Sequence, residues 1–120
     1  MKIAITSIGN TLDSTFEKRF GRSPYFIIYD TDTKTHQAIS NDKNLNAVQG
    51  AGVQSARNLM EAEVKHLITG HCGPKAFYLL QAAGIKIYAT DTATVQEAID
   101  QFNNGSLTPL EQADVESHWA

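Results

Sequence analysis

The segment Gly70–Lys75, which reads GHCGPK, holds the residues of this chain that are best suited to chemistry. His71 and Cys72 place a borderline and a soft donor side by side, a pair that suits iron, copper or zinc. Two ligands do not close a metal site, so a metal would arrive as a preformed cluster or be shared across a dimer. A helix is expected to begin at Gly73-Pro74, where a Cys72 thiolate is favoured. Packing as a small buried hydrophobe is an equally open role for this thiol.

Two other glycine-containing loops stand at the ends of expected elements. Phe20-Gly21-Arg22 lies between the first strands, and Gly50-Ala51-Gly52 lies at the start of a helix. Loops that follow parallel strands meet in one crevice of an open α/β sheet, where helix N-termini present backbone N–H groups to anions. These features predict an anion-binding site built from Arg22, Gly50, Ala51, Gly52, Gly70, His71, Cys72, Gly73 and Lys75, with His71 and Cys72 as metal donors. In the alternative, the glycines only set turns, Phe20 is a core residue and Arg22 is a solvated surface charge.

Other kinds of site have weaker support. Gly50–Ala56 loosely resembles a dinucleotide fingerprint, but Asn44–Gln49 is interrupted by Asn and Gln and is interpreted as polar, so no continuous apolar strand precedes these glycines. Adjacent Cys and His side chains in an extended loop tend to point apart, and no third residue orients them for nucleophilic catalysis. A two-metal nuclease needs carboxylates on its central strands, and Lys2–Ser7 has none. The chain is therefore expected to bind a ligand and not to be an enzyme.

The elements that must position these loops begin with three strands. Lys2–Ser7 opens the chain, and Tyr25–Tyr29 is a continuous apolar stretch typical of a strand covered on both faces. Thr33–Ser40 is a weaker candidate for the third strand. The turn at Asp30-Thr31-Asp32 is short, so the second and third strands are expected to form an antiparallel hairpin.

From residue 50 onward, helices alternate with the strands Val64–Thr69 and Ile85–Ala89. Thr94 and Glu97 have the spacing of a capping box at the start of the last helix. Gly84 is expected to end the helix that begins at Gly73-Pro74. The expected buried helix positions are Val53, Ala56, Leu59 and Met60, then Phe77, Leu80 and Ala83, then Val95, Ala98, Ile99 and Phe102. This order predicts a single α/β domain over residues 1–105, with a mixed five-stranded sheet and helices on its faces. Residues 106–120 are expected to form a C-terminal tail.

The composition limits the partners. The 120 residues include 10 Lys and Arg against 13 Asp and Glu, and a net charge of −3 argues against binding to nucleic acid. No apolar run approaches the roughly 20 residues of a membrane span, and the first residues have no signal-peptide pattern. We therefore expect a cytoplasmic protein that binds no membrane. A single cysteine excludes an internal disulfide, and both a monomer and a homodimer remain open.

The three loops also carry a set of motifs that extends into the neighbouring elements. The motifs are Leu12-Asp13-Ser14, Phe20-Gly21-Arg22 with Tyr25-Phe26, Gly50-Ala51-Gly52, Thr69–Phe77 (TGHCGPKAF) and Ala82–Ile87 (AAGIKI). Over roughly residues 1–105, this set resembles the dinitrogenase iron–molybdenum cofactor biosynthesis family. The resemblance implies a ribonuclease-H-like α/β fold that is used for binding and not for hydrolysis.

The same resemblance implies a ligand made of metal and sulfur. That ligand is the iron–molybdenum cofactor, its precursor, or a related cluster that contains molybdenum, iron or copper. A role in cofactor biosynthesis related to nitrogen fixation follows, with a cofactor donor or acceptor protein as partner. Many relatives have His just before the Phe-Gly pair, where this chain has Arg19, which leaves His71 and Cys72 as the nearest donors. The alternative function is a small regulatory or scaffold domain that binds a partner protein and no cluster.

Overall fold

The structure, a computed structural model, describes residues 1–42 and 51–113. The order of strands and helices matches the expected alternation, with one 3-10 turn added before the second strand. The elements are β1 (Lys2–Ser7), η1 (Phe20–Arg22), β2 (Tyr25–Asp30), β3 (Thr35–Ser40), α2 (Ala51–Glu61), β4 (His66–Thr69), α3 (Pro74–Ala82), β5 (Lys86–Ala89) and α4 (Val95–Asn103).

The five strands form one mixed sheet in the order β3-β2-β1-β4-β5. β2 is antiparallel to both β1 and β3, whereas β1, β4 and β5 are parallel to one another. This arrangement confirms the expected hairpin and the mixed five-stranded sheet of a single α/β domain. β1, β4 and β5 run in the same direction, so their carboxyl ends lie at the same end of the sheet, and the loops that follow them meet there. The ribonuclease-H-like assignment of this topology stays a prediction.

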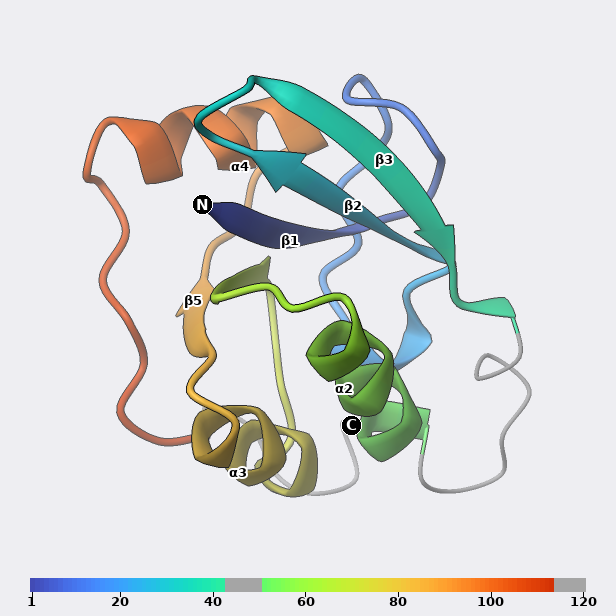
Figure 1. Ribbon diagram of the computed structural model, residues 1–120, viewed down its shortest axis with the longest axis vertical. Helices are drawn as coiled ribbons and strands as arrows, with labels where there is room; N and C mark the ends of the chain where they lie inside the picture. Colours follow the sequence, from blue (N-terminus) through green and yellow to red (C-terminus); the bar gives the residue numbers. More distant parts are fainter. Residues whose placement is uncertain (43–50, 114–120) are drawn as a thin grey trace.

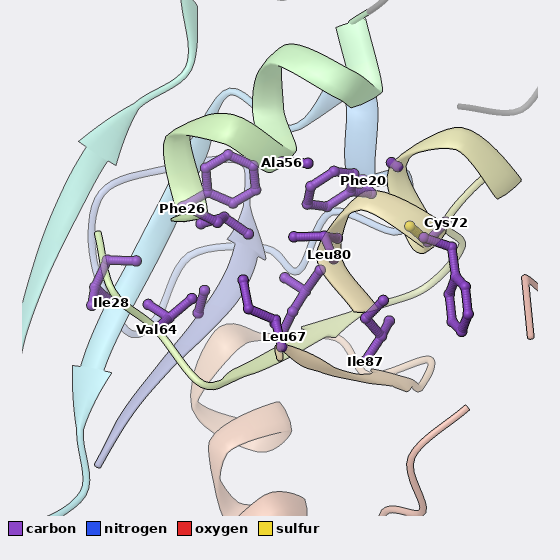
Figure 2. Close-up of a cluster of buried hydrophobic side chains, with 14 residues drawn as sticks. Phe20, Phe26, Ile28, Ala56, Val64, Leu67, Cys72, Leu80 and Ile87 are labelled. Atoms are coloured by element: carbon purple, nitrogen blue, oxygen red, sulfur yellow. The ribbon is translucent and has the colours of Figure 1, made fainter. Parts of the chain in front are cut away.

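Helices α2 and α3 cover one face of the sheet, and α4 covers the other (Figure 1). Two buried clusters result, which we call the α2–α3 cluster and the α4 cluster. Strand β2 contributes Phe26 and Ile28 to the first and Ile27 to the second, so the prediction that it is covered on both faces is confirmed. Figure 2 shows the α2–α3 cluster, in which Phe20, Phe26 and Leu80 are fully buried. Burial of each such side chain contributes roughly 1.5–3 kcal/mol.

Two expected helix positions are exposed instead of buried. Met60 is 37% exposed, because α2 turns Ala56 and Leu59 toward the sheet, and Met60 lies one residue round the helix from Leu59. Ala83 is also exposed, because it is the C-cap of α3 and no longer lies on the helix face that buries Phe77 and Leu80. The helix then ends as predicted at Gly84, whose φ of 82° is the left-handed conformation that favours glycine.

The capping box before α4 is present in a slightly altered form. The Thr94 side chain accepts a hydrogen bond from the Glu97 N–H at 3.2 Å, and Glu97 Oε2 accepts one from the Ala93 N–H at 3.2 Å. The second bond therefore reaches one residue further back than in the usual box. Within residues 1–42 and 51–113, no helix has the length and apolar character needed to cross a membrane.

Candidate functional site

Two of the three loops singled out from the sequence are joined by backbone hydrogen bonds. Arg19 and His71 form a parallel β-bridge, although they lie 52 positions apart in the sequence. The His71 N–H donates to the Lys18 carbonyl at 2.6 Å, and the Phe20 N–H donates to the His71 carbonyl at 3.1 Å. The segment that leads into η1 and the segment that leads into α3 therefore form one backbone unit.

Gly70 permits this close approach. A Cβ on Gly70 would lie 2.6 Å from the Lys18 carbonyl oxygen and 2.7 Å from the Lys18 Cα. Both atoms belong to the main chain, which has little freedom to move away. Gly70 is thus explained by close contact between the main chains of the two loops, a structural role that requires no ligand.

The joined loops border an open hollow of about 420 Å³. Its lining residues are Phe16, Glu17, Lys18, Arg19 and His71. The His71 ring is half-buried and its Nδ1 atom is buried, so the imidazole is held against the protein and is not extended into solvent. The structure therefore places the predicted donor His71 at the edge of a hollow that Lys18 and Arg19 also line.

The charges around this hollow are partly balanced. The Lys18 ammonium lies 2.8 Å from the Asp91 carboxylate, and the Arg19 guanidinium lies 3.5 Å from the Glu17 carboxylate. The Glu17 side chain is only 11% exposed, whereas Lys18 and Arg19 are each more than half exposed. Because both cations are exposed, they can turn toward an anion at small cost.

The first turn of α3 follows shortly after His71 in the chain, and its backbone N–H groups are potential hydrogen-bond donors to a ligand. Gly73 is the N-cap in an extended conformation (φ −69°, ψ 163°), Pro74 occupies the first helical position, and no side-chain cap is made within the described residues. The N–H groups of the first turn of a helix have no partner within that helix, and Pro74 has none to offer. Lys75, on the same turn, is exposed. This end of α3 therefore combines main-chain N–H groups that have no partner within the helix with an exposed lysine, a combination that suits an anion.

Cys72 lies on the inner side of the same loop. Its side chain is 1% exposed and belongs to the α2–α3 cluster, where Figure 2 shows it together with Phe20 and Leu80. The Cys72 Sγ lies 3.7 Å from the Gly73 carbonyl oxygen. This burial favours the role of small hydrophobe, which the sequence left open beside that of a metal ligand. His71 and Cys72, adjacent in the chain, thus face the surface and the core respectively.

The remaining predicted residues lie on η1 and α2. Arg22 ends η1 and is half-buried. Gly50 lies outside the described residues, Ala51 is the first residue of α2, and Gly52 is buried in its first turn. Helix α2 packs against both η1 and α3. The structure therefore joins the first and third loops directly, and α2 reaches them by packing.

Several residues of this region were not predicted from the sequence. Phe16, Glu17 and Lys18 line the hollow, and Asp91 pairs with Lys18. The Lys18-Arg19 pair before Phe20 was the available signal. Phe16 and Glu17 gave none, because their positions are fixed by tertiary backbone bonds, the Phe16 N–H to the Ala93 carbonyl and the Glu17 N–H to the Thr6 carbonyl.

The donor set excludes one kind of metal site in the described part of the chain. No three side chains of His, Cys, Asp or Glu there are grouped in a way that could hold a metal ion. The groups that remain are one imidazole, exposed cations and the N–H groups of a helix N-terminus. Such a set fits a bulky anion held mainly by hydrogen bonds and charge.

These features define a small α/β domain with a candidate anion-binding surface where a strand leads into a helix. A family model described as dinitrogenase iron-molybdenum cofactor matches residues 1–105, and the chain belongs to that family. The expected family resemblance is thereby confirmed.

Solved structures share both the fold and part of the sequence. The apo form of the orange protein from Desulfovibrio gigas is 34% identical, with a TM-score of 0.92 over 95% of this chain and 96% of that chain. A NifB-like protein of the DUF35 family from Thermotoga is 38% identical, with a TM-score of 0.83 over 95% and 97% of the two chains. Among proteins compared by sequence, an uncharacterized protein from Methanocaldococcus jannaschii is 31% identical over 114 aligned positions, and the alignment covers 92% of each chain.

Proposed function

We propose that this protein binds a metal–sulfur cluster as cargo during the biosynthesis of an iron–molybdenum cofactor or a related group, and that it does not catalyse a reaction. The observation that carries the proposal is the N-terminus of α3, which receives no side-chain cap from residues 1–42 or 51–113 and adjoins His71 on the bridged loops. Membership in the dinitrogenase iron-molybdenum cofactor family gives the chemical class of the cargo. The proposed cluster contains molybdenum or iron with sulfide, and copper is a further candidate.

Each proposed contact uses a group that suits a bulky anion. The first-turn N–H groups of α3 donate hydrogen bonds to sulfide or oxide atoms, and the helix dipole favours negative charge at the same place. Lys75 on α3 and Arg22 on η1 add full positive charges. His71 is the one metal donor proposed at the surface, and it is held in place by the bridge to Arg19.

The proposed binding surface contains fewer residues than the site predicted from the sequence, because two groups of predicted residues support the surface without contacting the ligand. Cys72 and Gly70 support the loop from inside, the first by packing in the α2–α3 cluster and the second by allowing the approach of Lys18. Gly52 and Ala51 act through α2, which packs against η1 and α3. The proposed binding surface consists of His71, the N-terminus of α3 from Gly73 to Lys75, and Arg22.

The proposal is tested by anaerobic titration of the purified chain with tetrathiomolybdate, alone and with copper(I), and with iron(II) plus sulfide. Visible absorbance and metal content after desalting report retention of the probe. The test variant is Arg22→Gln combined with Lys75→Gln. Its matched control is Lys65→Gln combined with Lys86→Gln, which removes the same charge from exposed positions at the amino ends of β4 and β5.

We expect the test variant to lose roughly tenfold in affinity at low salt and the control variant to bind as the wild type does. The difference should shrink at physiological ionic strength, where exposed charges are screened over about 8 Å. Equal affinity of both variants at low salt would remove Arg22 and Lys75 from the site. Failure of the wild type to retain any of these probes would contradict cluster binding and favour the scaffold alternative.

A further inference from the structure

The two edges of the sheet differ in how they are covered. At the β5 edge, Pro109 forms a bridge with Tyr88, and the Leu110 N–H donates to the Ile87 carbonyl at 2.7 Å. At the other edge, β3 is the last strand, and no described residue pairs with its outer side (Figure 1). The chain thus covers one edge with its own C-terminal segment and leaves a row of backbone groups on the other.

The pairing with β2 determines which groups of β3 point outward. The register pairs Ser40 with Tyr25, and just beyond it the Asn41 N–H donates to the Pro24 carbonyl at 2.8 Å. In an antiparallel ladder, the residues that bond to one neighbour alternate with those that point away from it. Because Asn41 bonds toward β2, the N–H and C=O groups of His36, Ala38 and Ser40 are directed to the open side.

The open edge has none of the usual protections along its length. β3 contains no proline and no Asp, Glu, Lys or Arg, and all of its residues except Ile39 are exposed. Natural edge strands usually carry such residues to prevent pairing with another chain. Charges of opposite sign stand instead just beyond the two ends of the strand, Lys34 before it and Asp42 after it. Both residues are exposed.

We propose that the outer edge of β3 pairs antiparallel with β3 of a second copy of this chain, with the two-fold axis at Ala38. Outward-directed residues must face each other across such a pair. With the axis at Ala38, His36 of each copy faces Ser40 of the other. Lys34, in the turn just before β3 of each copy, then comes near Asp42, just after β3 of the other. The opposite charges therefore meet twice in one dimer.

The charges select this register over its neighbours. A shift of two residues in one direction places Lys34 of each copy opposite Ser40 of the other and so separates it from Asp42. The same shift in the other direction removes the pairing of Lys34 with Asp42. Strand β4, which leads to the proposed binding surface, is three strands away from β3, so the dimer leaves that surface accessible.

The first test measures the mass of the full-length chain by sedimentation velocity from low micromolar to millimolar concentration. Ala38→Pro removes an outward N–H without removing a bond to β2, a position at which an edge strand tolerates proline. Ala38→Val keeps that N–H and is the matched control. We expect the wild type and Ala38→Val to dimerise with rising concentration and Ala38→Pro to stay monomeric. A wild type that is monomeric throughout, or an Ala38→Pro variant that dimerises equally well, would overturn the proposal.

The second test uses charge reversal and does not depend on tolerance of proline. Lys34→Glu and Asp42→Lys each place like charges together twice, so each should raise the dimer dissociation constant roughly three- to tenfold at low salt. The double variant restores opposite charges and should return to about the wild-type value. Single variants without effect, or a double variant no better than the single ones, would exclude this register.

Discussion

The connections β4–α3 and β5–α4 begin alike and end differently. Each follows a parallel strand and leads into a nine-residue helix. The second connection caps its own helix, because Thr94 accepts from the Glu97 N–H. The first has Gly73 and Pro74 at the same positions and makes no side-chain cap in the described structure. In the β5–α4 connection, a side chain of the connection itself accepts a hydrogen bond from an N–H group at the start of the helix. In the β4–α3 connection, the corresponding N–H groups are left for an acceptor from outside the connection.

The two connections also differ in what holds them. The β4–α3 loop is fixed by the bridge between His71 and Arg19 and by the contact of Gly70 with Lys18. Because the backbone is fixed by another loop, its helix N-terminus can stay open without loss of order. The comparison teaches that an uncapped helix end indicates a binding site most strongly when other contacts keep it rigid.

The largest effect is expected from breaking the support of the β4–α3 loop. Gly70→Ala places a Cβ against the Lys18 main chain, and overpacking of this kind costs about 3 kcal/mol. We expect a lower midpoint in urea and a lower affinity for tetrathiomolybdate, because His71 loses its position. A variant with wild-type stability would show that the loops do not approach as closely as described.

A smaller effect is expected from Cys72→Ser. This variant tests whether Cys72 is a core residue and does not bind the cluster. A hydroxyl in place of the thiol among apolar side chains should reduce the free energy of unfolding by about 2 kcal/mol. Retention of tetrathiomolybdate by the folded variant should be unchanged. Loss of binding with unchanged stability would instead assign the thiol to the cluster.

The other connection is tested by Thr94→Ala. Loss of the N-cap of α4 should cost about 1 kcal/mol in thermal or urea unfolding. Binding of the probe should not change, since this helix end is not part of the proposed surface.

Gly73→Ala is the converse variant. The φ and ψ angles of Gly73 suit any residue, so the backbone is not strained, and the added Cβ should weaken binding more than it lowers stability. Equal binding by both variants would break the comparison.

The smallest effect is a dependence of stability on pH that comes from the α4 side of the sheet. Burial lowers the pKa of His66 from 6.5, and Lys86 and the N-terminal ammonium lower it further, while its Nδ1 lies 3.0 Å from the Tyr88 hydroxyl. His66 therefore binds a proton less readily in the folded chain than in the unfolded one. The contribution of His66 to stability should be fully present above pH 6.5 and should decrease as the pH drops below it. His66→Gln should flatten this slope in urea titrations, and an unchanged slope would assign it to other groups.

The fold could be predicted because its signals are local. The apolar run of β2, the turn before β3, the Thr94–Glu97 spacing and the stop at Gly84 each act within a few residues. Met60 was placed wrongly because the apolar pattern of α2 allows more than one helix face to be buried, and tertiary packing chose the face of Ala56 and Leu59.

The site could be predicted only in part. The motif Gly70–Lys75 pointed to the β4–α3 loop, because a histidine, a cysteine and a lysine beside a helix-starting Gly-Pro pair are residue types that suit ligand binding. The sequence did not show that Gly70 makes room for Lys18 or that Cys72 turns inward, because both depend on a segment some 50 residues earlier in the chain.

The central claim is that the N-terminus of α3, and not that of α4, receives the anionic cargo. Amide chemical shifts of the ¹⁵N-labelled chain, recorded during titration with tetrathiomolybdate, test it most directly because every main-chain N–H reports its own surroundings. We predict the largest shifts at Lys75 and Ala76, with smaller ones at His71 and Arg22, and none at Val95–Glu97. Shifts confined to Val95–Glu97, or an absence of shifts in the first turn of α3 while the probe is retained, would contradict the claim.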